Sequence, residues 1–150
     1  MSVPAASPVE RFEAPAVRDR IVDAADWIDG WARSAGLSDD VVFAMRLCVE
    51  EAVTNVVFYA YAASPSEGRF WVEAWLEGPE ARLRITDEGA AFDVAAAKDP
   101  GIETDIENAT MGGRGVRLMR SFSQGLAYER RNDANMLTLA FLRGGPPAGT

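Results

Sequence analysis

The sequence contains no histidine and only one cysteine, Cys48, among its 150 residues. Without histidine, Ser-His-Asp and Cys-His nucleophilic sites are excluded, and the usual ligands of a zinc site are missing. A single cysteine cannot form a disulfide within the chain. Any acid–base chemistry must therefore come from carboxylates, lysine, tyrosine or hydroxyl groups.

Positive charge and long apolar runs are also scarce. Lys plus Arg number 15 against 23 Asp plus Glu, which gives a net charge of −8. This balance argues against a surface for nucleic acid or anionic membranes. No apolar run approaches the ~20 residues of a membrane span, and residues 1–10 lack the basic and apolar regions of a signal peptide. We therefore expect a cytoplasmic protein with neither nucleic-acid nor membrane partners.

The length of the chain predicts a single domain spanning residues 1–150. Its content of 48% hydrophobic and 25% charged residues is typical of a soluble globular protein. The first and last eight residues are rich in Pro, Gly and Ala, so we expect frayed tails around an ordered core of about residues 10–142.

The first half of this core predicts two helices. Apolar residues recur at helical spacing over 16–35 and the run ends at Gly36. Ser38 or Asp39 can cap a second helix that runs to about Ala60.

Beyond residue 68 the apolar period changes to two. Residues 70–77 and 82–86 predict a β-hairpin, and Trp71 and Trp75 share one of its faces, which is either a protein interface or core. An edge strand near 11–14, a short helix at 115–122 and strands near 124–131 and 135–142 complete the pattern. The order predicts an α+β, two-layer sandwich with helices on one face of a mostly antiparallel mixed sheet.

A first candidate site lies late in the second predicted helix, in Glu50-Glu51-Ala52-Val53-Thr54-Asn55. Glu51 and Asn55 are one turn apart and share a helix face, although Asn is a mediocre helix former. The Asn55 carbonyl could ligate Mg²⁺, which prefers oxygen ligands. The alternative is a solvent-exposed polar stripe.

A second candidate follows a predicted strand, where Asp87-Glu88-Gly89 forms an acidic turn. The Asp87 carboxylate can accept a hydrogen bond from an adenine amino group, and Gly89 lets a base approach the backbone closely. The alternative is an ordinary turn.

A third candidate is Gly112-Gly113-Arg114-Gly115-Val116, which leads into the short predicted helix. Backbone N–H groups and a helix N-terminus make this a plausible anion site, to which Arg114 can add charge. It is not a Walker A loop, because no Gly-Lys-Ser/Thr ends it. The alternative is a flexible hinge.

Taken in order, these motifs resemble a known family. Residues 46–61 (RLCVEEAVTNVVFYAY) are similar to the N box of the anti-sigma-factor serine kinases, which belong to the histidine-kinase-like ATPases. Residues 87–93 (DEGAAFD) and 112–120 (GGRGVRLMR) resemble the two glycine boxes, and 135–139 (NMLTL) is similar to the last strand. The resemblance spans roughly residues 10–142.

The resemblance implies a Bergerat-type ATP-binding fold with ATP and Mg²⁺ as cofactors. It implies Asn55 as the metal ligand and Asp87 as the carboxylate that recognises adenine. Gly89 would lie against the base, Thr138 would support the adenine from the last strand, and Glu51 would be the general base that activates a serine hydroxyl on a partner.

The second glycine box would hold the phosphates, through Gly113, Gly115 and the N–H groups around them, including those of Arg114 and Val116. The chain departs from the family at Tyr59, where histidine is usual, and at Ala91, which replaces a glycine. Neither change removes a proposed phosphate or metal contact.

The function that the resemblance implies is a serine/threonine protein kinase of the anti-sigma regulatory type. It would phosphorylate a small antagonist protein and bind a sigma factor or similar target. The alternative is a nucleotide-dependent binding module without phosphotransfer. A histidine kinase is disfavoured because no histidine can accept the phosphoryl group. Whether the chain forms a homodimer stays open.

Overall fold

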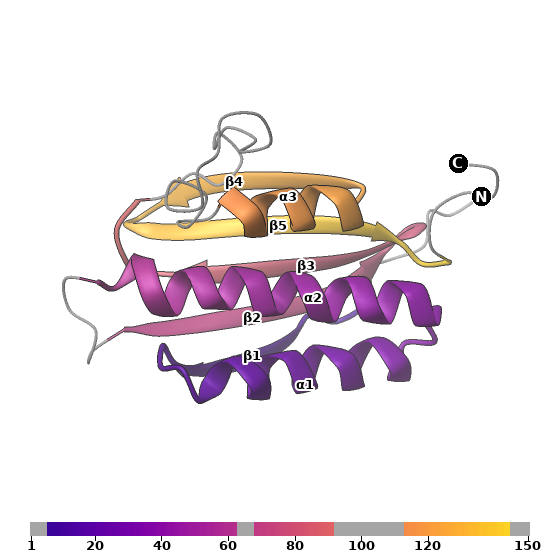
Figure 1. Cartoon of the computed structure of the whole chain (residues 1–150). Coiled ribbons are helices and arrows are strands. Elements are labelled where there is room, and N and C mark those ends of the chain that lie inside the picture. Colours follow the sequence, from indigo (N-terminus) through magenta and orange to yellow (C-terminus); the bar gives the residue numbers. More distant parts are fainter. Residues whose placement is uncertain (1–5, 63–67, 92–112, 145–150) are drawn as a thin grey trace.

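The fold is a single sheet with helices on one face (Figure 1). The computed structural model describes residues 6–62, 68–91 and 113–144. In chain order the elements are β1 (Glu10–Pro15), α1 (Arg20–Ser34), α2 (Asp39–Asn55), the π-helix η1 (Val56–Ala60), β2 (Arg69–Glu77), β3 (Glu80–Asp87), α3 (Gly113–Phe122), β4 (Gly125–Arg131) and β5 (Ala134–Leu142). This arrangement confirms the predicted α+β class.

The strands form a sheet of order β1-β2-β3-β5-β4. Every neighbouring pair within the described residues is antiparallel, where the sequence suggested a mostly antiparallel mixed sheet. The β4–β5 turn is made by Asn132 and Asp133, both with positive φ, as two-residue hairpins require. The register sets Asp87 at the end of β3 directly opposite Asn135 near the start of β5.

The core lies between the helices and the sheet face that they cover. Period-two alternation aligns Val72, Ile85 and Leu137 across three neighbouring strands, and all three are buried. From α2, Met45 and Val49 pack into the same cluster. The Ser38 hydroxyl accepts a hydrogen bond of 3.3 Å from the Val41 backbone nitrogen, which confirms the predicted N-cap.

The second predicted helix changes its hydrogen bonding before it ends. It is α-helical from Asp39 to Asn55 and then π-helical from Val56 to Ala60. A π-helical turn uses i→i+5 bonds and is often found at functional sites. Asn55 is therefore the last residue of α2, at the junction of the two helical forms.

The sheet face opposite the helices carries Trp71 and Trp75, which the sequence analysis assigned either to a protein interface or to the core. The Arg11 guanidinium carbon lies 5.6 Å from the Trp71 ring centroid, and that of Arg84 lies 5.0 Å from the Trp75 centroid. Trp75 is 8% exposed but lies outside the core cluster. It is neither core nor exposed apolar surface, because arginine stacks on it.

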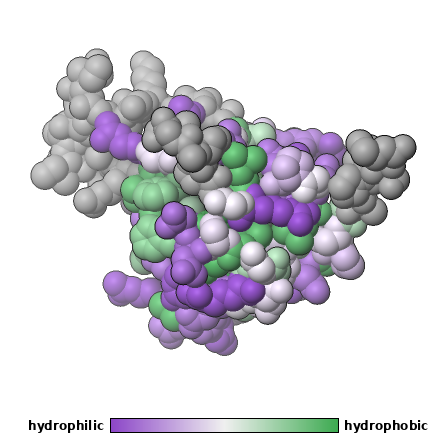
Figure 2. Space-filling view, turned by 90° about the vertical axis from the view of Figure 1, so that its right-hand side faces the viewer, coloured by the Kyte–Doolittle hydropathy of each residue, from purple (hydrophilic) through white to green (hydrophobic). Residues whose placement is uncertain are grey.

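Exposed aromatic surface is found instead where α2 begins and α3 ends. Phe43 and Phe122 are exposed and meet edge to face, with ring centroids 5.9 Å apart. They line a groove with Val41, Ala44 and Phe141. Figure 2 shows this end of the molecule, where hydrophobic and hydrophilic side chains intermingle. The groove lies at the opposite end of α2 from Asn55.

Candidate functional site

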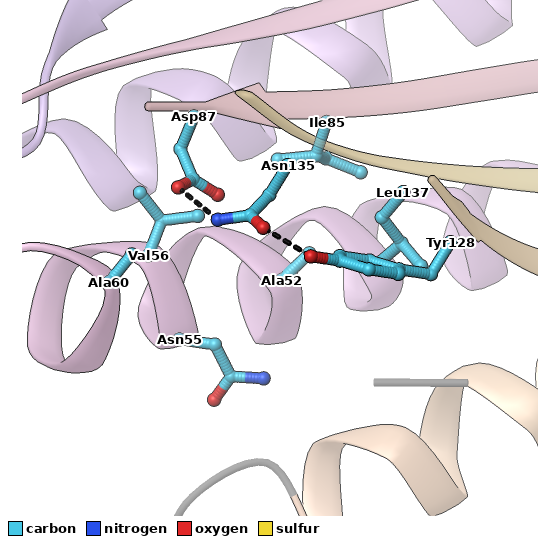
Figure 3. A pocket seen from close by; sticks show the side chains of 9 residues that line it. All are labelled: Ala52, Asn55, Val56, Ala60, Ile85, Asp87, Tyr128, Asn135 and Leu137. Atoms are coloured by element: carbon cyan, nitrogen blue, oxygen red, sulfur yellow. Dashed lines mark hydrogen bonds between the residues drawn. The ribbon is translucent and has the colours of Figure 1, made fainter. Parts of the chain in front are cut away.

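A pocket lies between the end of α2, η1 and the strands β3, β4 and β5 (Figure 3). It brings together two of the predicted site residues, Asn55 and Asp87. Its walls are mostly apolar, as is usual for a small-molecule site with a few placed polar groups. The lining residues are Ala52, Asn55, Val56, Ala60, Ile85, Asp87, Tyr128, Asn135 and Leu137.

Asp87 is the buried carboxylate of this pocket, with 6% of its surface exposed. Its Oδ1 accepts hydrogen bonds of 2.9 Å from the Gly89 backbone nitrogen and 2.9 Å from the Asn135 side-chain nitrogen. Burial raises the pKa of Asp87, while these two bonds and the charge of Arg130 act in the opposite direction. Within the described residues these bonds engage Oδ1, so Oδ2 is available as an acceptor.

Asn135 is a pocket residue that the sequence analysis missed. Its amide nitrogen also donates to the Ala90 carbonyl at 2.8 Å. Its amide oxygen accepts from the Tyr128 hydroxyl and from an Arg130 guanidinium nitrogen at 3.0 Å. Both amide protons and both oxygen lone pairs are therefore used.

The structure contradicts the prediction for Thr138. Leu137 and Leu139 point into the core, so the residue between them points to the other face of the sheet. There the Thr138 hydroxyl accepts a 3.3 Å hydrogen bond from Arg84. Asn135, on the same face as Leu137, occupies the place on β5 that was assigned to Thr138. The sequence contained the information that places Asn135 in the pocket, because Asn135, Leu137 and Leu139 follow one another at a spacing of two and therefore share one face of the strand.

Gly89 is needed for a close approach of two backbone segments. A Cβ atom built on Gly89 would lie 2.2 Å from the Ala60 carbonyl oxygen, which is too close for any side chain. That oxygen accepts a 2.8 Å hydrogen bond from the Ala90 nitrogen. The turn after β3 is therefore fastened to the end of η1, a role that was not predicted for Gly89.

Tyr61 fastens the same turn from the other side. Its hydroxyl donates to the Arg69 carbonyl at 2.6 Å and accepts from the Glu88 backbone nitrogen at 2.6 Å. Burial raises the pKa of Tyr61, so it stays a neutral donor. No sequence pattern indicates this contact, because both hydrogen-bond partners of Tyr61 are backbone groups.

Asn55 reaches the pocket from the last turn of α2. Its side-chain nitrogen is buried and has no hydrogen-bond partner within the described residues. An unused buried polar group is costly unless a ligand satisfies it. Glu51 lies one turn earlier and is half-buried, but it is not among the residues that line the pocket.

The second glycine box is only partly described. α3 begins at Gly113, so Gly113, Arg114 and Gly115 form its first turn, two residues before the predicted helix start. Nothing is described of the Arg114 and Val116 side chains, and Gly112 lies outside the described residues. The phosphate-binding prediction for this segment stays a prediction.

The described part of the chain contains no group of three or more His, Cys, Asp or Glu side chains that could hold a metal. Among the described helices, none has the length and hydrophobicity needed to cross a membrane.

Comparison with known proteins finds a family model and several relatives that this chain matches. Residues 14–141 match the model of the histidine kinase-like ATPase domain. The chain is 32% identical over 134 residues to the serine/threonine-protein kinase BtrW of Bordetella bronchiseptica, covering 89% of this chain and 93% of that protein.

Other relatives match over a smaller part of their length. The serine-protein kinase RsbW of Listeria monocytogenes is 28% identical over 98 residues, which are 63% of this chain and 62% of that protein. A solved structure of the RsbU and RsbW domains of Rv1364c from Mycobacterium tuberculosis has a TM-score of 0.67 at 17% identity. It covers 95% of this chain and 34% of that one, and at this identity it supports the fold alone.

Proposed function

Because the chain belongs to the anti-sigma-factor serine/threonine kinases of the histidine kinase-like ATPase family, we propose that it is an ATP-dependent protein kinase. It phosphorylates a small antagonist protein on a serine or threonine, and it binds a sigma factor or similar target in the cytoplasm. The observation that carries the proposal is an apolar pocket lined both by the buried Asp87 carboxylate and by Asn55, whose buried side-chain nitrogen has no hydrogen-bond partner within the described residues.

Asp87 and the apolar walls supply base recognition. The free Oδ2 of Asp87 accepts a hydrogen bond from the amino group of adenine. Ile85 and Leu137, which are side by side on β3 and β5, provide an apolar surface for the flat base. Burial of the carboxylate makes this hydrogen bond stronger than it would be in water.

Asn55 and the start of α3 supply the phosphate end. Asn55 would offer its side-chain oxygen, a hard ligand of the kind that Mg²⁺ prefers. Its buried side-chain nitrogen has no hydrogen-bond partner within the described residues and would donate to a phosphate oxygen. When bound, the metal neutralises charge on the β- and γ-phosphates. The backbone N–H groups around Gly113 and Gly115 face phosphate at a helix N-terminus.

Glu51 is the proposed general base. The serine Oγ of the antagonist attacks the γ-phosphorus, the bond to the β–γ bridging oxygen breaks, and the hydroxyl proton passes to Glu51. Glu51 shares a helix face with Asn55 one turn away. The neighbouring Glu50 does not share this helix face, and its carboxylate pairs with Arg46 at 3.3 Å.

A second candidate is a nucleotide-dependent binding protein without phosphotransfer. The observation that favours it is the position of Glu51 outside the residues that line the pocket. In this case nucleotide binding would change affinity for the partner, and Glu51 would be a part of the polar surface of α2.

The experiment that tests the proposal is transfer of label from ATP to a small antagonist protein encoded beside this gene. With Mg²⁺ present we expect labelled phosphate on a serine or threonine of the antagonist. Nucleotide binding without any labelled antagonist would favour the binding protein over the kinase.

A further inference from the structure

Asn135 lies between two groups of fixed hydrogen-bonding character. On one side is the Arg130 guanidinium, which can only donate. On the other side is Asp87, whose ionised carboxylate can only accept. The amide of Asn135 must therefore direct its oxygen toward Arg130 and its nitrogen toward Asp87. The orientation of an asparagine amide is normally ambiguous, but here the two neighbours determine it.

The fixed amide in turn determines what Asp87 can do. Two donors directed at Oδ1, from Asn135 and Gly89, favour the ionised carboxylate, because a charged oxygen accepts a hydrogen bond more strongly than the carbonyl oxygen of the neutral acid. This matters because Asp87 is buried, and burial alone favours the neutral acid. A neutral Asp87 would carry an O–H donor, which suits the keto oxygen of guanine as well as a carboxylate suits the amino group of adenine.

We propose that Asn135 is the specificity-determining positioning residue of the nucleotide pocket. Held by Arg130 and Tyr128, it keeps Asp87 an acceptor and so selects a purine with an amino group at position 6 over one with a keto group. Asn135 acts through Asp87, because its own four hydrogen bonds are all used within the protein. This inference rests on the proposed function, in that the pocket must bind a purine nucleotide.

The surroundings of Asp87 support the same role. The charged and titratable groups near it are Glu88 on its own turn, Tyr61 at the end of η1, and Arg130 and Tyr128 on β4. Arg130 also donates to the Gly89 carbonyl at 3.1 Å. One side chain on β4 therefore holds both the amide that orients Asp87 and the turn that follows it.

The test is calorimetric binding of Mg-ATP and Mg-GTP to the full chain and to four variants, across pH. We expect Asn135→Leu to lose at least about tenfold in ATP affinity, as removal of a hydrogen bond to a charged group predicts, with no matching loss for GTP. Arg130→Leu should shift selectivity in the same direction. Arg131→Leu is the matched control, because it removes the same charge from the next residue, whose side chain pairs with Glu129.

Asn135→Asp provides a readout that a purely structural role would not give. Two facing carboxylates repel when both are ionised, and they share a proton when the pH falls. ATP affinity should therefore be weak at alkaline pH and recover as the pH is lowered, because a protonated Asp at position 135 again donates to Asp87. Circular dichroism of each variant reports its fold.

The outcomes separate this inference from the proposed function. ATP binding with unchanged selectivity in Asn135→Leu, or pH-independent binding by Asn135→Asp, would overturn the role of Asn135 alone. Failure of the wild-type chain to bind either nucleotide would overturn the proposed function and the role of Asn135 together.

Discussion

At the scale of single residues, Asp87 is a buried ionisable group, and the proposed recognition of adenine requires its carboxylate to be charged. Burial raises its pKa above the value in the unfolded chain. In the interval between these two pKa values the folded protein binds more protons than the unfolded one. The contribution of Asp87 to stability is therefore fully present below the unfolded pKa and is lost as the pH rises through the folded pKa.

This direction of the pH dependence gives a prediction for the stability of Asp87→Asn, measured without nucleotide. The amide can keep its oxygen toward Gly89 and Asn135 while it carries no charge to bury. We expect its melting temperature to exceed that of the wild type at about pH 7, and the difference to shrink as the pH falls and wild-type Asp87 takes up a proton. Thermal melts of both proteins across pH measure it. A difference in melting temperature that grows toward acid pH would contradict the predicted direction of the pH dependence.

Asn55 gives a second prediction at this scale. Asn55→Ala removes the only oxygen that the proposal offers to the metal from α2, and it also removes a buried unsatisfied amide. We expect Mg-dependent ATP binding to be abolished while the fold persists. Titration calorimetry with and without Mg²⁺ checks this.

The control for Asn55 is Thr54→Ala, since within the described residues the Thr54 hydroxyl donates to the Glu50 carbonyl of its own helix. Thr54→Ala should bind ATP as the wild type does. Unchanged Mg-dependent affinity in a folded Asn55→Ala protein would refute the assignment of the metal ligand.

Some residues of the candidate site could be predicted from the sequence, and others could not. Asp87 and Asn55 could be placed in one pocket because each follows a clear apolar pattern and resembles a family motif. Thr138 was misplaced because family resemblance was preferred to alternation, which sets the face of a strand residue. Tyr61 could not be found, since its partners are backbone groups of distant segments.

At the scale of elements, the pocket depends on how η1 meets the turn after β3. The two segments are joined backbone to backbone, from the Ala90 nitrogen to the Ala60 oxygen. The order and type of the helices and strands followed from apolar periodicity, which is a local property. The change from α to π hydrogen bonding at Asn55 did not, because Val56 and Ala60 continue the helical apolar pattern unbroken.

This junction gives a prediction for Gly89→Ala. The added Cβ would lie 2.2 Å from the Ala60 oxygen, so the turn or η1 must shift. We expect a loss of about 1–3 kcal/mol in the free energy of unfolding, as for other forced overpacking, together with weaker ATP binding. Urea unfolding of both proteins measures the first effect.

Gly125→Ala on β4 is the matched control, because a Cβ there meets nothing within 4 Å. It should change the free energy of unfolding by no more than about 0.5 kcal/mol. Equal effects of the two substitutions would mean that the close approach at Gly89 is unimportant.

At the scale of the whole molecule, the sheet has two faces with different surroundings. The covered face holds the core and ends in the pocket. On the other face arginine side chains stack on Trp71, which is half-buried, and on Trp75, which is buried. Sequence periodicity predicted which residues share that face, but not the stacking, which depends on the register between strands.

Phosphotransfer is also a property of the whole molecule, because it needs the base, the metal, the phosphates and the antagonist in one arrangement. Glu51→Gln keeps the size and polarity of the side chain but cannot accept a proton. Glu50→Gln is its control, one residue away and paired with Arg46. ATP affinity should stay within a few-fold of the wild type in both variants.

The most direct test is single-turnover transfer from saturating Mg-ATP to the neighbouring antagonist, where binding defects cannot mimic a loss of chemistry. The account predicts rapid transfer by the wild type and by Glu50→Gln, and a rate at least about a hundredfold lower for Glu51→Gln. Transfer by Glu51→Gln at the wild-type rate would contradict the assignment of the base. No transfer by the wild type would contradict the kinase itself.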